Sequence, residues 1–199
     1  LNPYKQWVKW ARNAGFHVTW LPLKPEIAKK FDADAAYKFF KTIEGVPYGY
    51  HNFLFGWLDT PDHNYPPVLS PEAVAPLFGM IEKIYPNASE SIFNLAMNKR
   101  LNTTGLNVPQ IAAEAARRNL TVPDLLAMVE VDGWVYPDGV SYVCSSFVIA
   151  MYKAAGLFGK VAVNAVEFTP RDLYMLDFFS PNPPVPSNCK KVDPTNPFC

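Results

Sequence analysis

The chain lacks several features that identify whole classes of protein. Lysine plus arginine and aspartate plus glutamate number 18 each, so the net charge gives no reason to expect nucleic acid or an anionic membrane surface as a partner. No apolar run approaches the ~20 residues of a transmembrane helix, so no membrane span is expected. No glycine-rich phosphate loop occurs. Four possible metal ligands are close in sequence but lack the regular spacing of known zinc motifs: His51, Asp59, Asp62 and His63. We therefore expect no cofactor and no metal.

Cysteine is also scarce, with 3 in 199 residues. Hydrophobic residues make up 49% of the chain, which suits one packed domain, expected at residues 1–180, followed by a proline-rich tail at 181–199. Cys189 and Cys199 lie in this tail, and a segment without its own core gains most from a disulfide in an oxidising compartment. Pairing these two leaves Cys144 as a free thiol.

Three glycosylation acceptor patterns point to the secretory pathway. They begin at Asn87, Asn102 and Asn119, and none contains a blocking proline. Together with the expected disulfide, they predict a glycoprotein that is secreted or lysosomal or vacuolar. The chain opens with Leu1 instead of methionine, which we interpret as a proteolytically processed product or a fragment.

Residues 139–156 predict a turn that leads into a largely apolar helix. Gly139 ends the turn, Ser141 is the expected cap of the first free amides, and Gly156 stops the helix. Cys144 lies in the first turn, where the positive end of a helix favours a thiolate. This placement indicates a nucleophile. The alternative is an ordinary core cysteine, because free cysteines are among the most buried residues.

The rest of the chain mixes helical and extended patterns. Residues 16–21 alternate and are rich in aromatic and β-branched side chains, which predicts a strand. Two shorter strands are expected at 134–136 and 161–163. Residues 51–59 are apolar throughout and leave strand and helix open. Helices are expected at 3–15, 25–30, from Asp32 or Asp34 to 45, and at 70–84, 89–101, 109–118, 121–128, 144–156 and from 170 onward.

The order of four segments resembles a known family of cysteine hydrolases. They are residues 3–7 (Pro-x-x-x-Trp), the strand 16–21, the loop Gly45-Val46-Pro47-Tyr48, and the helix start Cys144-Ser145-Ser146-Phe147-Val148. In this order they resemble the circularly permuted NlpC-like branch of the papain fold, the YiiX-like hydrolases related to lecithin–retinol acyltransferase. The resemblance implies an α+β fold: a papain-like core with a small antiparallel sheet, a buried helix that bears the cysteine, and an all-helical insertion at 60–130.

The resemblance also implies which residues form the site. Cys144 is the implied nucleophile, and Tyr48 and Ser145 are implied to line the substrate groove. Two departures concern the substrate: Gly49 stands where these proteins often have Asp, and Ser146 where they often have Glu.

A thiol nucleophile needs a base within ~3 Å, and the family's histidine precedes the tryptophan helix with which this chain begins. We therefore expect the base on an N-terminal segment of the same precursor, bound as a second chain. Within this chain, His51 is the preferred candidate, oriented by Asp59 if the segment is extended. The alternative for His51 is a buried histidine satisfied by backbone groups. His17 and His63 are expected to face solvent.

These observations predict a secreted or lysosomal cysteine hydrolase, a peptidase or amidase, that forms an acyl-enzyme on Cys144. The bond cleaved can be a peptide, a cell-wall amide or a lipid ester. Two alternatives stay open: a thiol acyltransferase or lipase that acts on lipid esters, and a non-catalytic secreted glycoprotein that uses the same fold for binding or structure.

Overall fold

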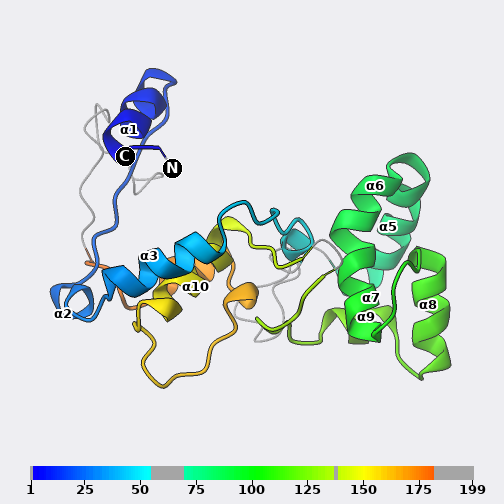
Figure 1. Cartoon of the computed structure of the whole chain (residues 1–199). Helices are drawn as coiled ribbons and strands as arrows, with labels where there is room; N and C mark the ends of the chain where they lie inside the picture. The colour runs from blue at the N-terminus through cyan, green and yellow to red at the C-terminus, as the bar shows by residue number, and fades with distance from the viewer. Residues whose placement is uncertain (1, 55–69, 137–138, 182–199) are drawn as a thin grey trace. The chain divides into compact units, whose positions relative to one another are not determined.

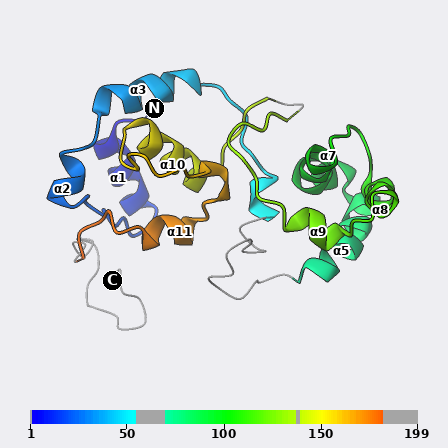
Figure 2. The same ribbon diagram turned by 90° about the horizontal axis from the view of Figure 1, so that it is seen from below.

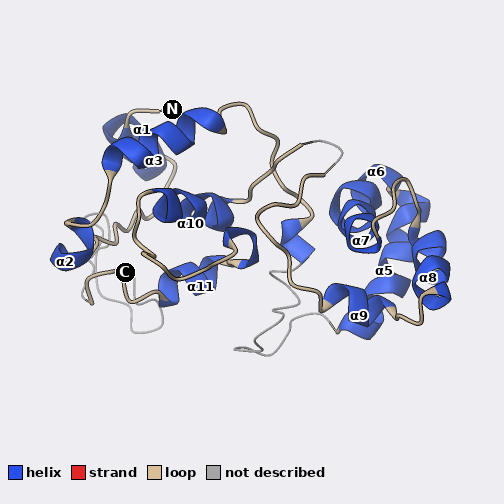
Figure 3. Cartoon of the chain, turned by 60° about the horizontal axis from the view of Figure 1, so that its bottom comes forward, coloured by secondary structure: helices blue, strands red, loops and turns tan. Residues whose placement is uncertain are grey.

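The computed structural model describes residues 2–54, 70–136 and 139–181 (Figure 1). The chain divides into two units, one formed by residues 1–30 with 176–199 and the other by residues 31–175. Within the described residues the regular structure is helical, and Figure 3 draws no strand there. None of the described helices combines the length and hydropathy that a membrane span requires.

The predicted α+β core with an antiparallel sheet is wrong. The extended pairings among the described residues are single bridges: Leu23 with Phe179, Tyr48 with Tyr142, and Tyr136 with Gly139. Residues 16–21 and 161–163 carry no strand assignment. Alternation and β-branched side chains favour an extended backbone, but a strand exists only where a second segment completes its ladder of hydrogen bonds. No described segment does so here.

Among its described residues, the first unit contains two helices joined by extended chain. Helix α1 (Tyr4–Asn13) is followed by Gly15, whose φ of 82° ends the helix. Helix α2 (Pro25–Ala28) begins with a proline, which costs no hydrogen bond at that position. Residues on either side of the Leu23–Phe179 bridge add two backbone hydrogen bonds, from Lys24 to Phe178 and from Ser180 to Pro22.

In the second unit, the helix that begins at Cys144 packs between shorter elements. Helix α10 (Cys144–Ala154) lies beside α3 (Ala33–Thr42), as Figure 1 shows, and against α11 (Pro170–Met175), as Figure 2 shows. The 3₁₀ turn η2 (Ala165–Glu167) also contacts α10. The side chain of Asp32 caps α3. The ring of Phe39 packs against those of Tyr142 and Phe147, with centroids 6.0 and 6.5 Å apart.

A second set of helices in this unit builds its own core. It comprises α5 (Pro71–Ile84), α6 (Pro86–Ser89), the π-helical turn η1 (Glu90–Asn94), α7 (Leu95–Leu101), α8 (Val108–Arg117) and α9 (Val122–Leu126). Phe78 and Phe93 stack in its centre with centroids 4.9 Å apart. Leu54, from the chain before α5, is fully buried in the same core. These helices lie within the segment 60–130 in which the pattern predicts helices.

Candidate active site

Cys144 is the first residue of α10, and its thiol is free and exposed. Val143 precedes it in an extended conformation, with φ −93° and ψ 173°. The hydroxyl of Ser146 accepts a hydrogen bond from the Val143 amide at 2.9 Å and donates one to the Val143 carbonyl at 3.1 Å. Ser146 therefore closes the start of the helix, and the predicted cap at Ser141 is wrong. Serine does here what glutamate does at the third position of a capping box.

Two pockets flank the thiol. The α11-side pocket has a volume of about 280 Å³, and the α3-side pocket about 230 Å³. Cys144 and Val143 line both. The other lining residues of the α11-side pocket are Asn52, Phe53, Ser145, Val166, Glu167, Phe168, Thr169 and Pro170. Those of the α3-side pocket are Ile43, Val46, Pro47, Tyr48, Tyr142 and Phe147. A substrate can thus extend to either side of the sulfur.

The loop that contains Tyr48 meets the residues just before α10. Tyr48 forms a parallel bridge with Tyr142, and the Gly49 amide donates to the Tyr142 carbonyl at 3.0 Å. The Tyr48 hydroxyl interacts with both the backbone and the thiol of Cys144. Burial, followed by the nearby Cys144, raises the pKa of Tyr48, so the phenol stays a neutral hydrogen-bond donor. Tyr48 therefore lies next to Cys144, and both residues line the α3-side pocket.

Buried polar side chains surround the start of α10. Ser145, Ser141 and Asn52 are 2%, 6% and 5% exposed. The hydroxyls of both serines and both polar atoms of the Asn52 carboxamide find no hydrogen-bond partner among the described residues. Asn52 was not predicted from the sequence. The available signal was an amide side chain inside an otherwise apolar run, directly after the candidate base His51.

The imidazole of His51 contacts a different group of side chains. It is 2% exposed, and its Nε2 lies 3.7 Å from a carboxylate oxygen of Glu130. Its ring centroid lies 3.9 Å from that of Tyr136, whose hydroxyl donates to the same Glu130 oxygen. Burial, with help from Arg100, lowers the pKa of His51 to about 4, so the ring is neutral at pH 7. His51 does not line either pocket beside Cys144 as these are described.

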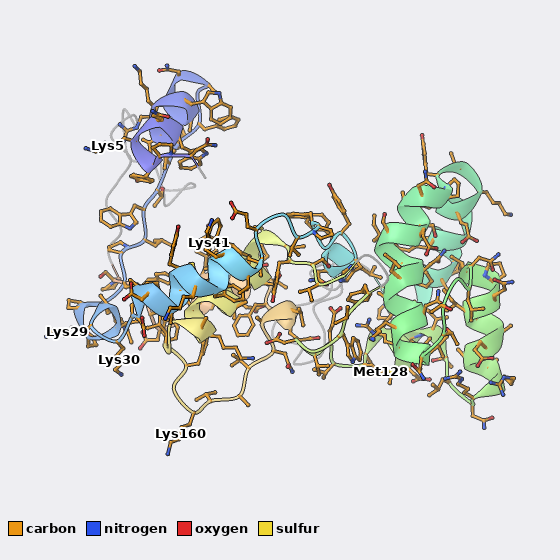
Figure 4. All side chains as sticks on the ribbon, viewed as in Figure 1. Lys5, Lys29, Lys30, Lys41, Met128 and Lys160 are labelled. Carbon is orange, nitrogen blue, oxygen red and sulfur yellow. The ribbon has the colours of Figure 1, made fainter. Side chains whose placement is uncertain are left out.

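Glu130 and Arg100 complete this buried cluster. Burial raises the pKa of Glu130 to about 7, against the opposing effect of Arg100. Burial lowers the pKa of Arg100 to about 10, while Glu130 and Glu167 favour its charged form. The guanidinium lies 5.2 Å from the ring centroid of Trp134 and donates to the carbonyls of Ala96 and of Met128, which is labelled in Figure 4. None of these residues was predicted to belong to a site.

The remaining predicted residues are distributed as follows. His17 is exposed and belongs to the first unit, whereas Cys144 belongs to the second. Asp59, His63, Cys189 and Cys199 lie outside the described residues. The three acceptor asparagines, Asn87, Asn102 and Asn119, are exposed. Within the described part of the chain, no group of three or more histidine, cysteine, aspartate or glutamate side chains could hold a metal ion.

Comparison with known proteins does not assign the chain to a family. No protein-family model, curated protein or solved structure matches the chain. The site itself combines an accessible thiol at a helix start, two adjoining pockets, and several buried polar side chains. His51, the described histidine of the second unit, contacts Glu130 and Tyr136 and is not among the residues that line the two pockets beside that thiol.

Proposed function

We propose that this chain carries the nucleophile of a cysteine hydrolase, with Cys144 forming an acyl-enzyme. The observation that supports the proposal best is the position of Cys144, exposed at the first residue of α10 between two pockets. The amides in the first turn of a helix have no partner within the helix and point toward its N-terminus. They can therefore stabilise the negative charge that develops during acyl transfer.

The reaction proceeds in two steps. A base takes the thiol proton, the sulfur attacks the substrate carbonyl carbon, and the π electrons move to the oxygen. The adduct collapses, the bond to the leaving group breaks, and the protonated base supplies the proton that the leaving group needs. Water then attacks the acyl-thioester by the same route and releases the acid.

We propose that the base is an imidazole from an upstream segment of the same precursor, held as a second chain. The described contacts of His51 are with Glu130 and Tyr136, and its pKa of about 4 makes it a poor base at neutral pH. The expected site of action is the secretory or lysosomal pathway, as the acceptor patterns and cysteine usage suggest.

The pocket linings favour an uncharged, apolar acyl group. Phe53, Val166 and Phe168 dominate the α11-side pocket, and Glu167 is the charged residue among its described lining. The α3-side pocket is lined by aliphatic and aromatic side chains with no described charge. A negatively charged cell-wall amide would find no oppositely charged side chain in the described lining of either pocket. A positively charged one would find only Glu167. We therefore favour apolar peptide or lipid ester substrates.

Labelling of the thiol under native conditions tests the proposal first. Iodoacetamide at neutral pH should add one label, at Cys144, by intact mass and peptide mapping, and Cys144→Ala should remove it. The precursor, expressed whole, should hydrolyse p-nitrophenyl butyrate with an initial burst, and Cys144→Ala should abolish the burst. An unreactive thiol with no burst would support the non-catalytic glycoprotein instead, and a burst that survives Cys144→Ala would show that another residue is the nucleophile.

A second measurement addresses the partner. Mass spectrometry of the purified protein should find an upstream polypeptide that contains a histidine and stays bound under native conditions. Adding an alcohol acceptor to the burst assay separates hydrolase from acyltransferase, because an acyltransferase would form the new ester in preference to the free acid.

A further inference from the structure

The carboxamide of Asn52 is buried beside the proposed nucleophile, and no described residue satisfies its hydrogen bonds. The residue is 5% exposed, and neither its Nδ2 nor its Oδ1 has a partner among the described residues. Asn52 lines the α11-side pocket together with Cys144 and Ser145. Buried polar groups in folded proteins are nearly always hydrogen-bonded, so an amide left without a partner requires an explanation. A hydrogen bond to a substrate atom is one.

The backbone fixes Asn52 relative to the start of α10. Its amide donates to the Gly49 carbonyl at 3.0 Å, and the Gly49 amide donates to the Tyr142 carbonyl at 3.0 Å. Two hydrogen bonds therefore connect Asn52 to the residues that lead directly into Cys144. A Cβ at position 49 would lie 3.5 Å from Asn52 Nδ2 and 3.0 Å from Ser141 Oγ. Glycine at this position leaves room for both side chains, where aspartate would not.

Ser145 gives independent support for a ligand at the same place. Its side chain is 2% exposed, its hydroxyl has no described partner, and it lines the same pocket. Two polar side chains that lack a partner among the described residues therefore adjoin the first turn of an eleven-residue helix, whose own first amides lack partners within the helix. This set of donors suits an oxygen atom that gains negative charge, because preorganised donors stabilise such an atom without reorganisation.

We propose that Asn52 is a catalytic residue whose Nδ2 donates a hydrogen bond to the oxyanion formed when Cys144 attacks a carbonyl. This inference rests on the proposed function. As the carbon–sulfur bond forms, the carbonyl π electrons move to oxygen, which accepts hydrogen bonds from Asn52 Nδ2 and from the amides of the first turn. When the leaving group departs, the electrons return and the hydrogen bonds weaken. The apolar acyl portion of the substrate occupies the α11-side pocket.

The test compares two reactions of the same thiol in the whole precursor. Acylation by p-nitrophenyl butyrate passes through an oxyanion, whereas alkylation by iodoacetamide is a displacement at a saturated carbon and forms none. Removing one oxyanion donor lowers acyl transfer by roughly 100- to 1000-fold. We therefore expect Asn52→Ala and Asn52→Leu to lower the acylation rate by about that factor, while the alkylation rate stays within about twofold of wild type.

Two further readouts separate this role from others. Asn52→Leu replaces an unsatisfied buried amide by an apolar side chain of similar size, so Tm should be equal to or above that of wild type. The pH midpoint of acylation should not move, because Asn52 does not orient the base. A lower Tm with equal loss in both reactions would mean a structural role, and a shifted midpoint would mean that Asn52 positions the base. Either result overturns the proposal, as does an unchanged acylation rate.

The wild-type protein separates failure of the proposal from failure of the function. A wild-type burst that Cys144→Ala abolishes supports the hydrolase, and the Asn52 variants then decide the role of the amide. If the wild-type thiol is alkylated but never acylated, the hydrolase and the oxyanion role are both wrong.

Discussion

The carboxylate of Glu167 accepts a hydrogen bond from the backbone amide of Glu130, a residue 37 positions earlier in the chain. Glu167 belongs to η2 and lines the α11-side pocket, whereas Glu130 lies beyond α9 in the buried cluster with His51. One wall of the pocket beside Cys144 is thus hydrogen-bonded to the segment that follows the second set of helices. Arg100 faces both carboxylates, so its charge favours this arrangement.

Shortening Glu167 should destabilise the protein. Glu167→Ala leaves the Glu130 amide without its acceptor, and a buried group left unsatisfied costs about 1–3 kcal/mol. Glu167→Gln keeps an acceptor oxygen and removes only the charge, so its cost should be smaller. The free energy of unfolding from urea titrations measures both. Exposed Glu26 on α2 supplies the control, and Glu26→Ala should change stability by less than about 0.5 kcal/mol. Equal costs for Ala and Gln would contradict the hydrogen bond.

The buried pair His51 and Glu130 should impose opposite pH dependences on stability. The pKa of Glu130 is raised from 4.5 to about 7, so between these values the folded protein binds the extra proton and stability falls as pH rises. The pKa of His51 is lowered from 6.5 to about 4, so between these values the unfolded chain binds the extra proton and stability rises with pH. In the wild-type protein the two slopes offset each other between about pH 4.5 and 6.5.

Single substitutions should reveal each slope. In His51→Gln, the free energy of unfolding should fall by up to about 1.4 kcal/mol per pH unit as pH rises from 4.5 to 7. In Glu130→Gln, it should rise by a similar amount per unit between pH 4 and 6.5. Urea titrations followed by tryptophan fluorescence at half-unit intervals give both curves. Slopes of the same sign in the two variants would show that the pair is not buried together.

Local features of the sequence predicted the start of α10 well. Gly139 and Gly156 have φ values of 100° and 80°, and such backbone conformations follow from glycine itself. The helix between them is signalled by its own residues, and Cys144 falls in its first turn. The predicted cap was Ser141, whereas Ser146 closes the helix start. Both serines lie close in sequence to the start of the helix, and the direction of each side chain decides which hydroxyl reaches the backbone.

Features that depend on distant partners could not be predicted. The strand pattern at residues 16–21 describes one segment, whereas a sheet requires a second in register. The same limit applies to the site. Asn52 acquires its place through Gly49 and the contact of that residue with Tyr142, and Arg100 meets Glu130 only after two sets of elements have packed. No periodicity within either segment reports such contacts.

Adding a methyl group at Gly49 should disturb the site. Its Cβ would lie 3.0 Å from Ser141 Oγ and 3.4 Å from the backbone nitrogen of Tyr142, which cannot move freely. Overpacking of this kind costs about 1–3 kcal/mol. Gly49→Ala should therefore lower the urea midpoint and change the iodoacetamide rate at Cys144. Gly133→Ala is the matched control, because nothing lies within 4 Å of its Cβ. If both variants behave alike, the close approach at position 49 is not present in solution.

Glycosylation can be tested without disturbing the fold if each substituted residue can adopt the backbone conformation of the asparagine it replaces. Asn102 and Asn119 are exposed and have φ values of 52° and 58°, a conformation that glycine also adopts without strain. Glutamine there would cost about 1–2 kcal/mol. The proteins are secreted from eukaryotic cells, and we expect Asn102→Gly and Asn119→Gly each to lower the intact mass by one glycan. After all samples have been enzymatically deglycosylated, the Tm of each variant should be nearly equal to that of wild type. Asn87 is also exposed, but Ser89 of its acceptor pattern is fully buried in the folded protein, so modification there requires transfer before folding. A single unglycosylated mass for the wild-type protein would contradict the secretory assignment.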